Sequence, residues 1–89
     1  MGEAVPEGRR IEIPSNATGI HIENMVLQPH HARLFEVLCQ AAGIIPVRQS
    51  NGYDLAAPRG LSDQARKTLE DTLQGFADGY CSEMEVQAF

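Results

Sequence analysis

Two adjacent histidines and one cysteine are the first residues in this chain that could do chemistry together. His30 and His31 lie nine and eight residues before Cys39 in the stretch QPHHARLFEVLCQAAG. A zinc site needs three or four imidazole, thiolate or carboxylate ligands at close range. On a helix, eight or nine residues correspond to roughly 12 to 13 Å of rise. The spacing therefore predicts no metal site and favours packing roles for these three side chains.

The rest of the sequence carries no catalytic motif. It has no glycine-rich phosphate loop, no HExxH pattern and no local signature of a Ser-His-Asp or Cys-His-Asp triad. Cys39 and Cys81 are too few and too far apart for a disulfide framework or a CxxC motif. We therefore expect a non-enzymatic protein without a cofactor. Because no secretory signal is visible, we also expect it to be cytoplasmic, with reduced thiols.

A short stretch around His31 resembles a phosphotransfer motif. HAR at residues 31–33, at a helix start, is similar to the phosphorylated-histidine motif of the histidine phosphocarrier protein of the sugar phosphotransferase system. IPVRQSNG is similar to a strand and turn of that family. The resemblance implies a nucleophilic His31 assisted by Arg33. The family has Pro where this chain has Leu34, and Gly-Leu where it has Pro29-His30. A histidine phosphocarrier-like protein is therefore a further alternative function.

Charge is distributed unevenly along the chain. Twelve acidic and seven basic residues give a net charge of −5, and the stretch 68–89 holds five acidic residues and no Lys or Arg. This balance argues against nucleic-acid binding, which depends on Lys and Arg neutralising phosphates. No apolar run approaches the roughly 20 residues of a membrane-spanning helix. We expect neither nucleic acid nor a membrane as a direct partner.

The order of sequence patterns predicts the fold. Residues 1–8 show no pattern and are expected to form a flexible leader to a single domain at 9–89. Period-two alternation predicts strands near Ile20–Ile22 and near Val86, and residues 44–58 form a hairpin pattern. Helical patterns run from Pro29 toward Gly43 and from Ser62 toward Gly79.

Strand, helix, strand, strand, helix, strand is the order of the ferredoxin-like βαββαβ plait, a two-layer α+β fold. Its antiparallel sheet would carry both helices on one face. A rival interpretation pairs Ile11–Ile13 with Ile20–Ile22 and yields tandem ββα-ββα units. In either case the first helix is expected to bury a continuous apolar face made of Leu34, Phe35, Val37, Leu38, Ala41 and Ala42.

The register of the hairpin is predicted from its faces. A three-residue loop at 50–52, with Gly52 left-handed, pairs Val47 with Leu55 and Arg48 with Asp54. A two-residue Asn51-Gly52 turn would instead place Val47 on the face of Asp54. We prefer the three-residue loop because it collects apolar side chains on one face.

This register divides the sheet into two faces. The side chains expected to point toward the helices are Ile20, Ile22, Val47, Tyr53, Leu55, Met84 and Val86. Those expected on the open face are His21, Glu23, Arg48, Asp54, Glu83 and Glu85. The open face would be acidic and without aromatic residues, which does not suit the stacking of RNA bases.

The acidic side chains lead to a functional hypothesis. We expect a docking surface for a basic patch on another protein, formed by Glu23, Asp54, Glu70, Asp71, Asp78, Glu83 and Glu85. A small acidic regulator or inhibitor fits this description. By analogy of size and charge, a phage-type, anti-CRISPR-like inhibitor of a host nucleic-acid-binding complex is one example.

Other functions stay open. The acidic residues could serve solubility alone. A small-molecule-binding regulatory domain on the same fold, with its ligand at a dimer interface, is the alternative function. The free edges of the sheet leave a homodimer as a further possibility.

Overall fold

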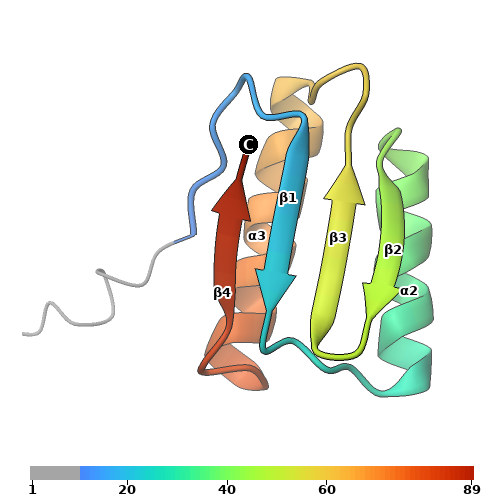
Figure 1. The fold of residues 1–89 in the computed structure, drawn as a ribbon, viewed down its shortest axis with the longest axis vertical. Coiled ribbons are helices and arrows are strands. Elements are labelled where there is room, and N and C mark those ends of the chain that lie inside the picture. The colour runs from blue at the N-terminus through green and yellow to red at the C-terminus, as the bar shows by residue number, and fades with distance from the viewer. Residues whose placement is uncertain (1–10) are drawn as a thin grey trace, which may run out of the picture.

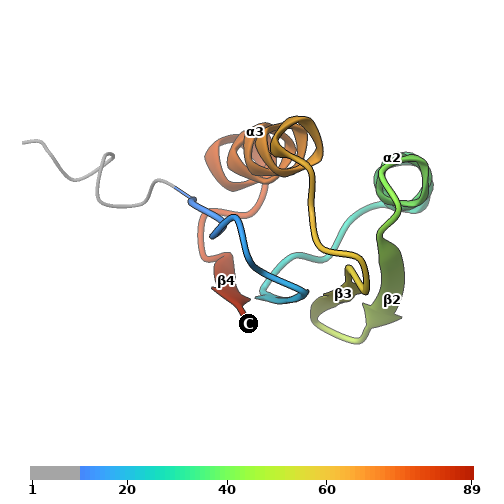
Figure 2. The ribbon, with the colours of Figure 1, turned by 90° about the horizontal axis from the view of Figure 1, so that it is seen from above.

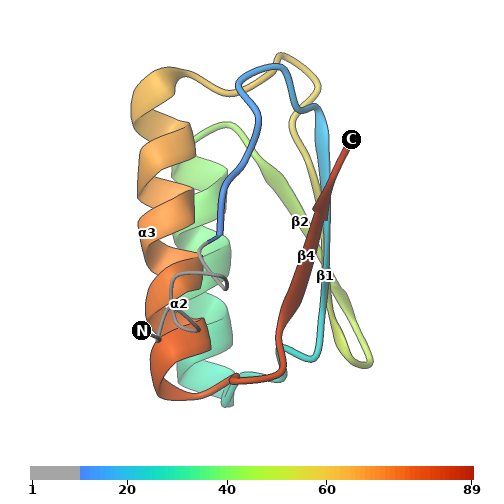
Figure 3. The ribbon, with the colours of Figure 1, turned by 90° about the vertical axis from the view of Figure 1, so that its left-hand side faces the viewer.

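The fold is a two-layer α+β plait. The computed structural model describes residues 11–89, and the leader expected at residues 1–8 lies outside them. The elements are β1 (Gly19–Glu23), α2 (Pro29–Ala41), β2 (Ile45–Gln49), β3 (Gly52–Ala56), α3 (Asp63–Gly79) and β4 (Glu85–Ala88). The strands pair antiparallel in the order β2-β3-β1-β4 (Figure 1). Both helices cover the same face of the sheet (Figures 2 and 3), so the predicted βαββαβ arrangement is confirmed.

Residues 11–14 do not add a strand to this sheet. The main-chain N–H of Ile11 donates to Oε1 of Gln74 at 2.8 Å, and that of Ile13 donates to Oε2 of Glu70 at 2.7 Å. Both acceptors belong to α3, so the segment runs along that helix. The rival tandem ββα interpretation, which paired this segment with Ile20–Ile22, is wrong.

Local signals set the helix ends as expected. Pro29 begins α2, and Gly43, with φ of +80°, follows its end in the left-handed conformation that glycine adopts without steric cost. Ser62 caps α3, since its Oγ accepts a hydrogen bond from the N–H of Ala65 at 3.1 Å. The core lies between the layers, and its largest fully buried side chains are Tyr53, Phe35, Ile22, Met25, Ile44, Leu69, Leu73 and Cys39.

The apolar face of α2 is wider than the face it buries. Phe35 is buried as expected, and it is joined by Ala32 and Cys39. Leu34 is 65% exposed and Val37 53% exposed, which contradicts the predicted buried face; Ala41 is exposed as well. The helix layer holds only α2 and α3, and within residues 11–89 no further element covers the outer flank of α2 (Figure 2).

The predicted hairpin register is also wrong, by one residue. Gln49 pairs with Gly52, so the loop holds two residues, and Val47 lies opposite Asp54. Gly52 is not left-handed. Instead, it pairs with Glu23 of β1, where an added Cβ would lie 1.9 Å from the carbonyl oxygen of Ile22. Glycine is needed there for close backbone approach, not for a bulge.

The shift by one residue exchanges the faces of β2. Val47, expected beneath the helices, lies on the open face. Arg48, expected on the open face, lies opposite Tyr53 on the helix side. The other inward predictions agree with the structure: Ile20, Ile22, Tyr53, Leu55 and Met84 are buried, and Val86 packs partly buried against the core.

Candidate functional site

The open face of the sheet carries rows of side chains that change from acidic at one end of the strands to apolar at the other. Figure 1 views this face, with the helices behind it. The strand registers, extended by the main-chain bonds between Gly19 and Phe89, define three rows across the strands. We call them the acidic row (Gln49, Gly52, Glu23, Glu85), the middle row (Val47, Asp54, His21, Gln87) and the apolar row (Ile45, Ala56, Gly19, Phe89).

His21 occupies the centre of this face, between two carboxylates. Its Nδ1 lies 2.5 Å from Oδ1 of Asp54, and its Nε2 lies 2.9 Å from Oε2 of Glu23. Gln49 donates from Nε2 to the other oxygen of Asp54 at 3.0 Å. The hydrogen bond to Asp54, followed by that to Glu23, raises the pKa of His21 above its usual value. The arrangement favours the imidazolium, because only that form donates from both ring nitrogens.

The site presents more negative than positive charge. Glu85 lies on the strand next to Glu23 and pairs with it in the β1–β4 register. Together with His21 and Gln87, these residues line a hollow of about 60 Å³. Within residues 11–89, no group of three or more His, Cys, Asp or Glu side chains is placed to hold a metal ion. Carboxylates are also the groups that pair with ammonium and guanidinium cations through charge-assisted hydrogen bonds.

The seven acidic residues predicted to form one docking surface are divided between the two layers. Glu23, Asp54 and Glu85 share the open face, and Glu83 lies in the turn before β4, where its carbonyl oxygen accepts a hydrogen bond from Asn24 at 3.1 Å. The other three, Glu70, Asp71 and Asp78, belong to α3 in the opposite layer.

On α3, each of these three acids has a local partner. Glu70 lies 3.4 Å from Arg66, Asp71 lies 4.0 Å from Lys67, and Asp78 accepts a hydrogen bond from Gln74 at 3.0 Å. Because α3 lies in the other layer, the candidate surface consists of the open-face carboxylates, with Glu83 at its border.

The open face differs from the sequence prediction in two further ways. Arg48 is absent from it, which makes the face more acidic than expected. Phe89, which the prediction did not include, belongs to it: its ring reaches to 3.5 Å from the Cβ position of Gly19. A sequence signal for this existed, because Phe89 continues the alternation that places Glu85 and Gln87 on the same face.

Arg48 joins a polar cluster on the other side of the sheet. The guanidinium Nη2 lies 2.8 Å from Oε2 of Glu36 on α2, and the Tyr53 hydroxyl donates to the same oxygen at 2.7 Å. The hydrogen bond from Tyr53, followed by that from Arg48, lowers the pKa of Glu36. Burial, and then the bond to Glu36, raises the pKa of Tyr53 to about 12. This cluster connects α2 to the sheet.

Of the two adjacent histidines, His30 is exposed and His31 is half-buried. The ring of His31 is 4.1 Å from that of His30 and 5.4 Å from that of Tyr80, measured between centroids. Arg33 does not face His31, because residues two apart point to different sides of a helix. Cys39 and Cys81 are free and buried, and burial raises the pKa of the Cys39 thiol to about 12. A neutral thiol is a poor nucleophile.

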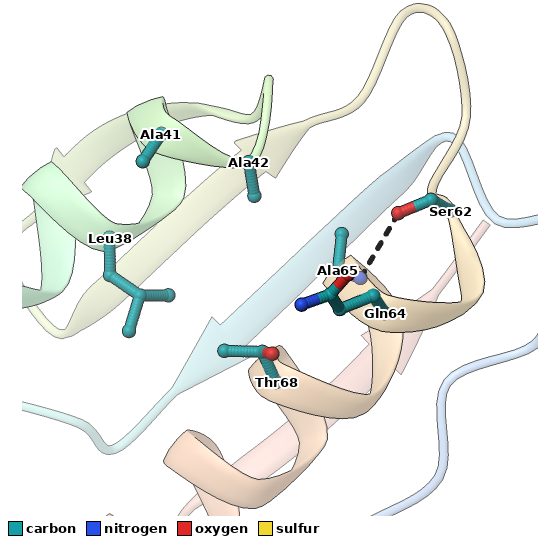
Figure 4. Close-up of a pocket in the computed structure, with 7 residues that line it drawn as sticks. All are labelled: Leu38, Ala41, Ala42, Ser62, Gln64, Ala65 and Thr68. Carbon is teal, nitrogen blue, oxygen red and sulfur yellow. Dashed lines mark hydrogen bonds between the residues drawn. The ribbon is translucent and has the colours of Figure 1, made fainter.

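A second concave feature lies between the helices. It is a groove of about 500 Å³, formed where α2 ends and α3 begins (Figure 4). Its lining residues are Leu38, Ala41, Ala42, Ser62, Gln64, Ala65 and Thr68, none of which is charged. At the opposite end the helices meet through aromatic rings, with Phe35 and Phe76 6.0 Å apart. Small side chains at one end and large ones at the other leave this groove open.

Comparisons with known proteins found no match: no protein family, no curated protein and no solved structure matches this chain. Among residues 11–89, no helix has the length and apolar character needed to cross a membrane. Geometry alone therefore defines the class, a two-layer α+β plait whose open sheet face changes from acidic to apolar.

Proposed function

We propose that this protein is a non-enzymatic regulator that binds a basic surface of another protein through its open sheet face. The observation that carries the proposal is the placement of Glu23, Asp54 and Glu85 on one uncovered face. Among the described residues of that face, His21 is the only one able to carry positive charge. Complementary charge accelerates encounter and selects the partner.

Solubility alone is the competing explanation, and the structure supplies a contrast that separates the two. The acids of α3 contribute to the net charge as much as those of the open face, yet they lie in the other layer. Solubility depends on the total charge, whereas docking depends on where the charge lies.

The test compares two double variants with the same change in charge. Glu23→Lys with Glu85→Lys alters the open face, and Asp71→Lys with Asp78→Lys alters α3. Each immobilised protein is used to capture partners from a cell lysate, after equal thermal midpoints have shown that both variants fold. We expect proteins captured by the wild type to be retained by the α3 variant and lost by the open-face variant. Raising the salt concentration should also weaken capture. Equal capture by all three proteins would contradict the proposal.

The nature of the regulation is part of the same proposal. A small acidic chain that covers a basic surface fits an inhibitor, including an anti-CRISPR-like inhibitor of a nucleic-acid-binding complex, because such complexes expose Lys and Arg to phosphate. Two buried free cysteines support placing it in the reducing cytoplasm.

A second candidate function, binding of a small apolar molecule, is favoured by the groove between the helices. Its volume of about 500 Å³ falls within the range of known ligand sites, roughly 300 to 1,000 Å³. Ala65→Phe would fill the groove. If the groove binds a fluorescent apolar probe such as anilinonaphthalene sulfonate, this variant should abolish the signal.

A further inference from the structure

We propose that the occupant of the open face is an amphipathic helix of the partner, lying across the strands. Its apolar side chains would cover the apolar row, and its Lys or Arg side chains would meet the acidic row. This inference rests on the proposed function and adds to it the shape and chemistry of the bound segment.

The first argument is the exposure of apolar side chains beside the carboxylates. Ile45 is 54% exposed, Val47 49% and Phe89 70%. They lie on the same face as Glu23 and Glu85. A partner that offered only Lys and Arg would leave this apolar area in water. An occupant with an apolar side and a cationic side would cover both parts of the face.

The second argument is size. Four strands about 4.8 Å apart give the face a width of about 14 Å, which nine or ten helical residues span at 1.5 Å each. The acidic and apolar rows are four residues apart along β2, about 14 Å at 3.4 Å per residue. A helix with its side chains is about 10 to 12 Å in diameter. One helix of about three turns therefore covers most of the face. An extended segment is narrower, and it would cover only one row if it lay across the strands or only one strand if it lay along them.

The third argument concerns a second copy of this chain as the occupant. Its helices are poor in unpaired positive charge: α2 has only Arg33, and on α3 Arg66 and Lys67 already face carboxylates. Packing two open faces against each other would place the acidic row of one copy against either the acidic row or the apolar row of the other, so its carboxylates would meet like charges or lose water without gaining a cation. Like charges at such an interface are repulsive. The charge distribution therefore favours a different, basic partner.

The experiment uses designed peptides as probes and single variants of the full chain. The first fluorescent 14-residue peptide places Leu on one side of a helix and Lys on the other. The second has the same composition in an order that spreads Lys around the helix, and the third replaces Lys with Glu. Fluorescence anisotropy measures the affinity of each peptide for the wild type and for two matched pairs of variants. The pairs are Ile45→Ser with Leu34→Ser, and Glu85→Lys with Asp71→Lys.

We expect the amphipathic basic peptide to bind about tenfold more tightly than the rearranged peptide, and the acidic peptide not to bind. Ile45→Ser should weaken binding about threefold or more, and Glu85→Lys about tenfold, in line with the loss of one contact each. Leu34→Ser and Asp71→Lys, which lie on the helix layer, should change it less than twofold.

The outcomes separate this inference from the proposed function. Equal binding of both basic peptides, with no effect of Ile45→Ser, overturns the helix inference, while a loss with Glu85→Lys still supports the acidic docking face. If Glu85→Lys also has no effect, both fail. If Leu34→Ser weakens peptide binding and Ile45→Ser does not, the peptide binds to the helix layer and the inference is overturned. The absence of binding by any peptide would overturn it as well.

Discussion

At the scale of single residues, His21 links the charge of the open face to its stability. Its imidazole bonds to Asp54 and Glu23, and these bonds raise its pKa above the unperturbed value of 6.5. A group whose pKa is higher in the folded than in the unfolded state stabilises the fold fully below its unfolded pKa. That contribution is lost as the pH rises through the folded pKa.

The first prediction follows from the raised pKa of His21. The difference in unfolding free energy between the wild type and His21→Gln should be largest below about pH 6.5. It should shrink at higher pH, as His21 loses its proton. Urea unfolding of both proteins between pH 5.5 and 9 measures the difference, and an NMR titration of His21 reports the pKa directly. A folded-state pKa at or below 6.5 would contradict the geometry.

Gly52 is the second residue whose identity is dictated by its position. An added Cβ would lie within 3 Å of two backbone atoms of Ile22, which cannot move aside as a flexible side chain could. Gly52→Ala should destabilise the fold by about 3 kcal/mol, the upper part of the usual overpacking range. Gly75→Ala, on α3 with open space around it, is the matched control and should stabilise by about 0.5 to 1 kcal/mol. Urea unfolding measures both, and equal effects would refute the close-approach explanation.

At the scale of elements, α2 is connected to the sheet by Glu36. Its Oε2 receives hydrogen bonds from Tyr53 of β3 and from Arg48 of β2. The lowered pKa of Glu36 means that this stabilisation is present above the unfolded pKa, near 4.5, and is lost as the pH falls through the folded pKa.

Tyr53→Phe tests this connection, because it keeps the ring and removes only the hydroxyl. It should cost about 1.5 to 3 kcal/mol at neutral pH, the contribution of a hydrogen bond to a charged group. The cost should diminish on acidification as Glu36 is protonated. Tyr80→Phe provides the control, since Tyr80 is 69% exposed, and it should change stability by less than about 0.5 kcal/mol. A pH-independent cost of Tyr53→Phe would argue against the bond to Glu36.

At the scale of the whole molecule, the free edge of β2 bears on self-association. The main-chain hydrogen bonds of Asn51 and Ala57 go to the β1 side of β3. The main-chain N–H and C=O groups of the even-numbered residues between them therefore point toward β2. In the antiparallel pattern, the main-chain groups of their β2 partners point toward β3. The main-chain groups of Pro46 and Arg48 therefore point away from β3, to the free edge of the sheet. Proline has no N–H to offer, which is a common protection of sheet edges.

A homodimer formed by strand pairing is therefore expected to be weak at this edge in the wild type. Pro46→Thr restores an outward N–H and should increase self-association, which analytical ultracentrifugation over a range of concentrations would measure. Val47→Thr changes the neighbouring residue, whose N–H already faces β3, and should not increase it. A wild-type dimer that Pro46→Thr fails to strengthen would show that β2 pairing is not the contact.

Much of the architecture could be predicted because its causes are local. Ser62 and Gly43 mark helix ends through hydrogen bonds and backbone angles within a few residues. The alternation in β1 and β4 sorts Ile20 and Val86 inward and Glu23 and Glu85 outward, whatever the rest of the chain does. The order of elements, the two layers and half of the acidic surface follow from such short patterns.

Only the tertiary structure decided the register of the hairpin and the membership of the site. With a two-residue loop, Gly52 pairs with Glu23 and lies close to the backbone of Ile22, a contact between strands distant in sequence. That one-residue shift sent Arg48 to Glu36 and Val47 to the open face. The acids of α3 resemble those of the sheet in the sequence, but the chain folds them into the opposite layer. Which charges share a surface depends on long-range packing, and no short pattern encodes it.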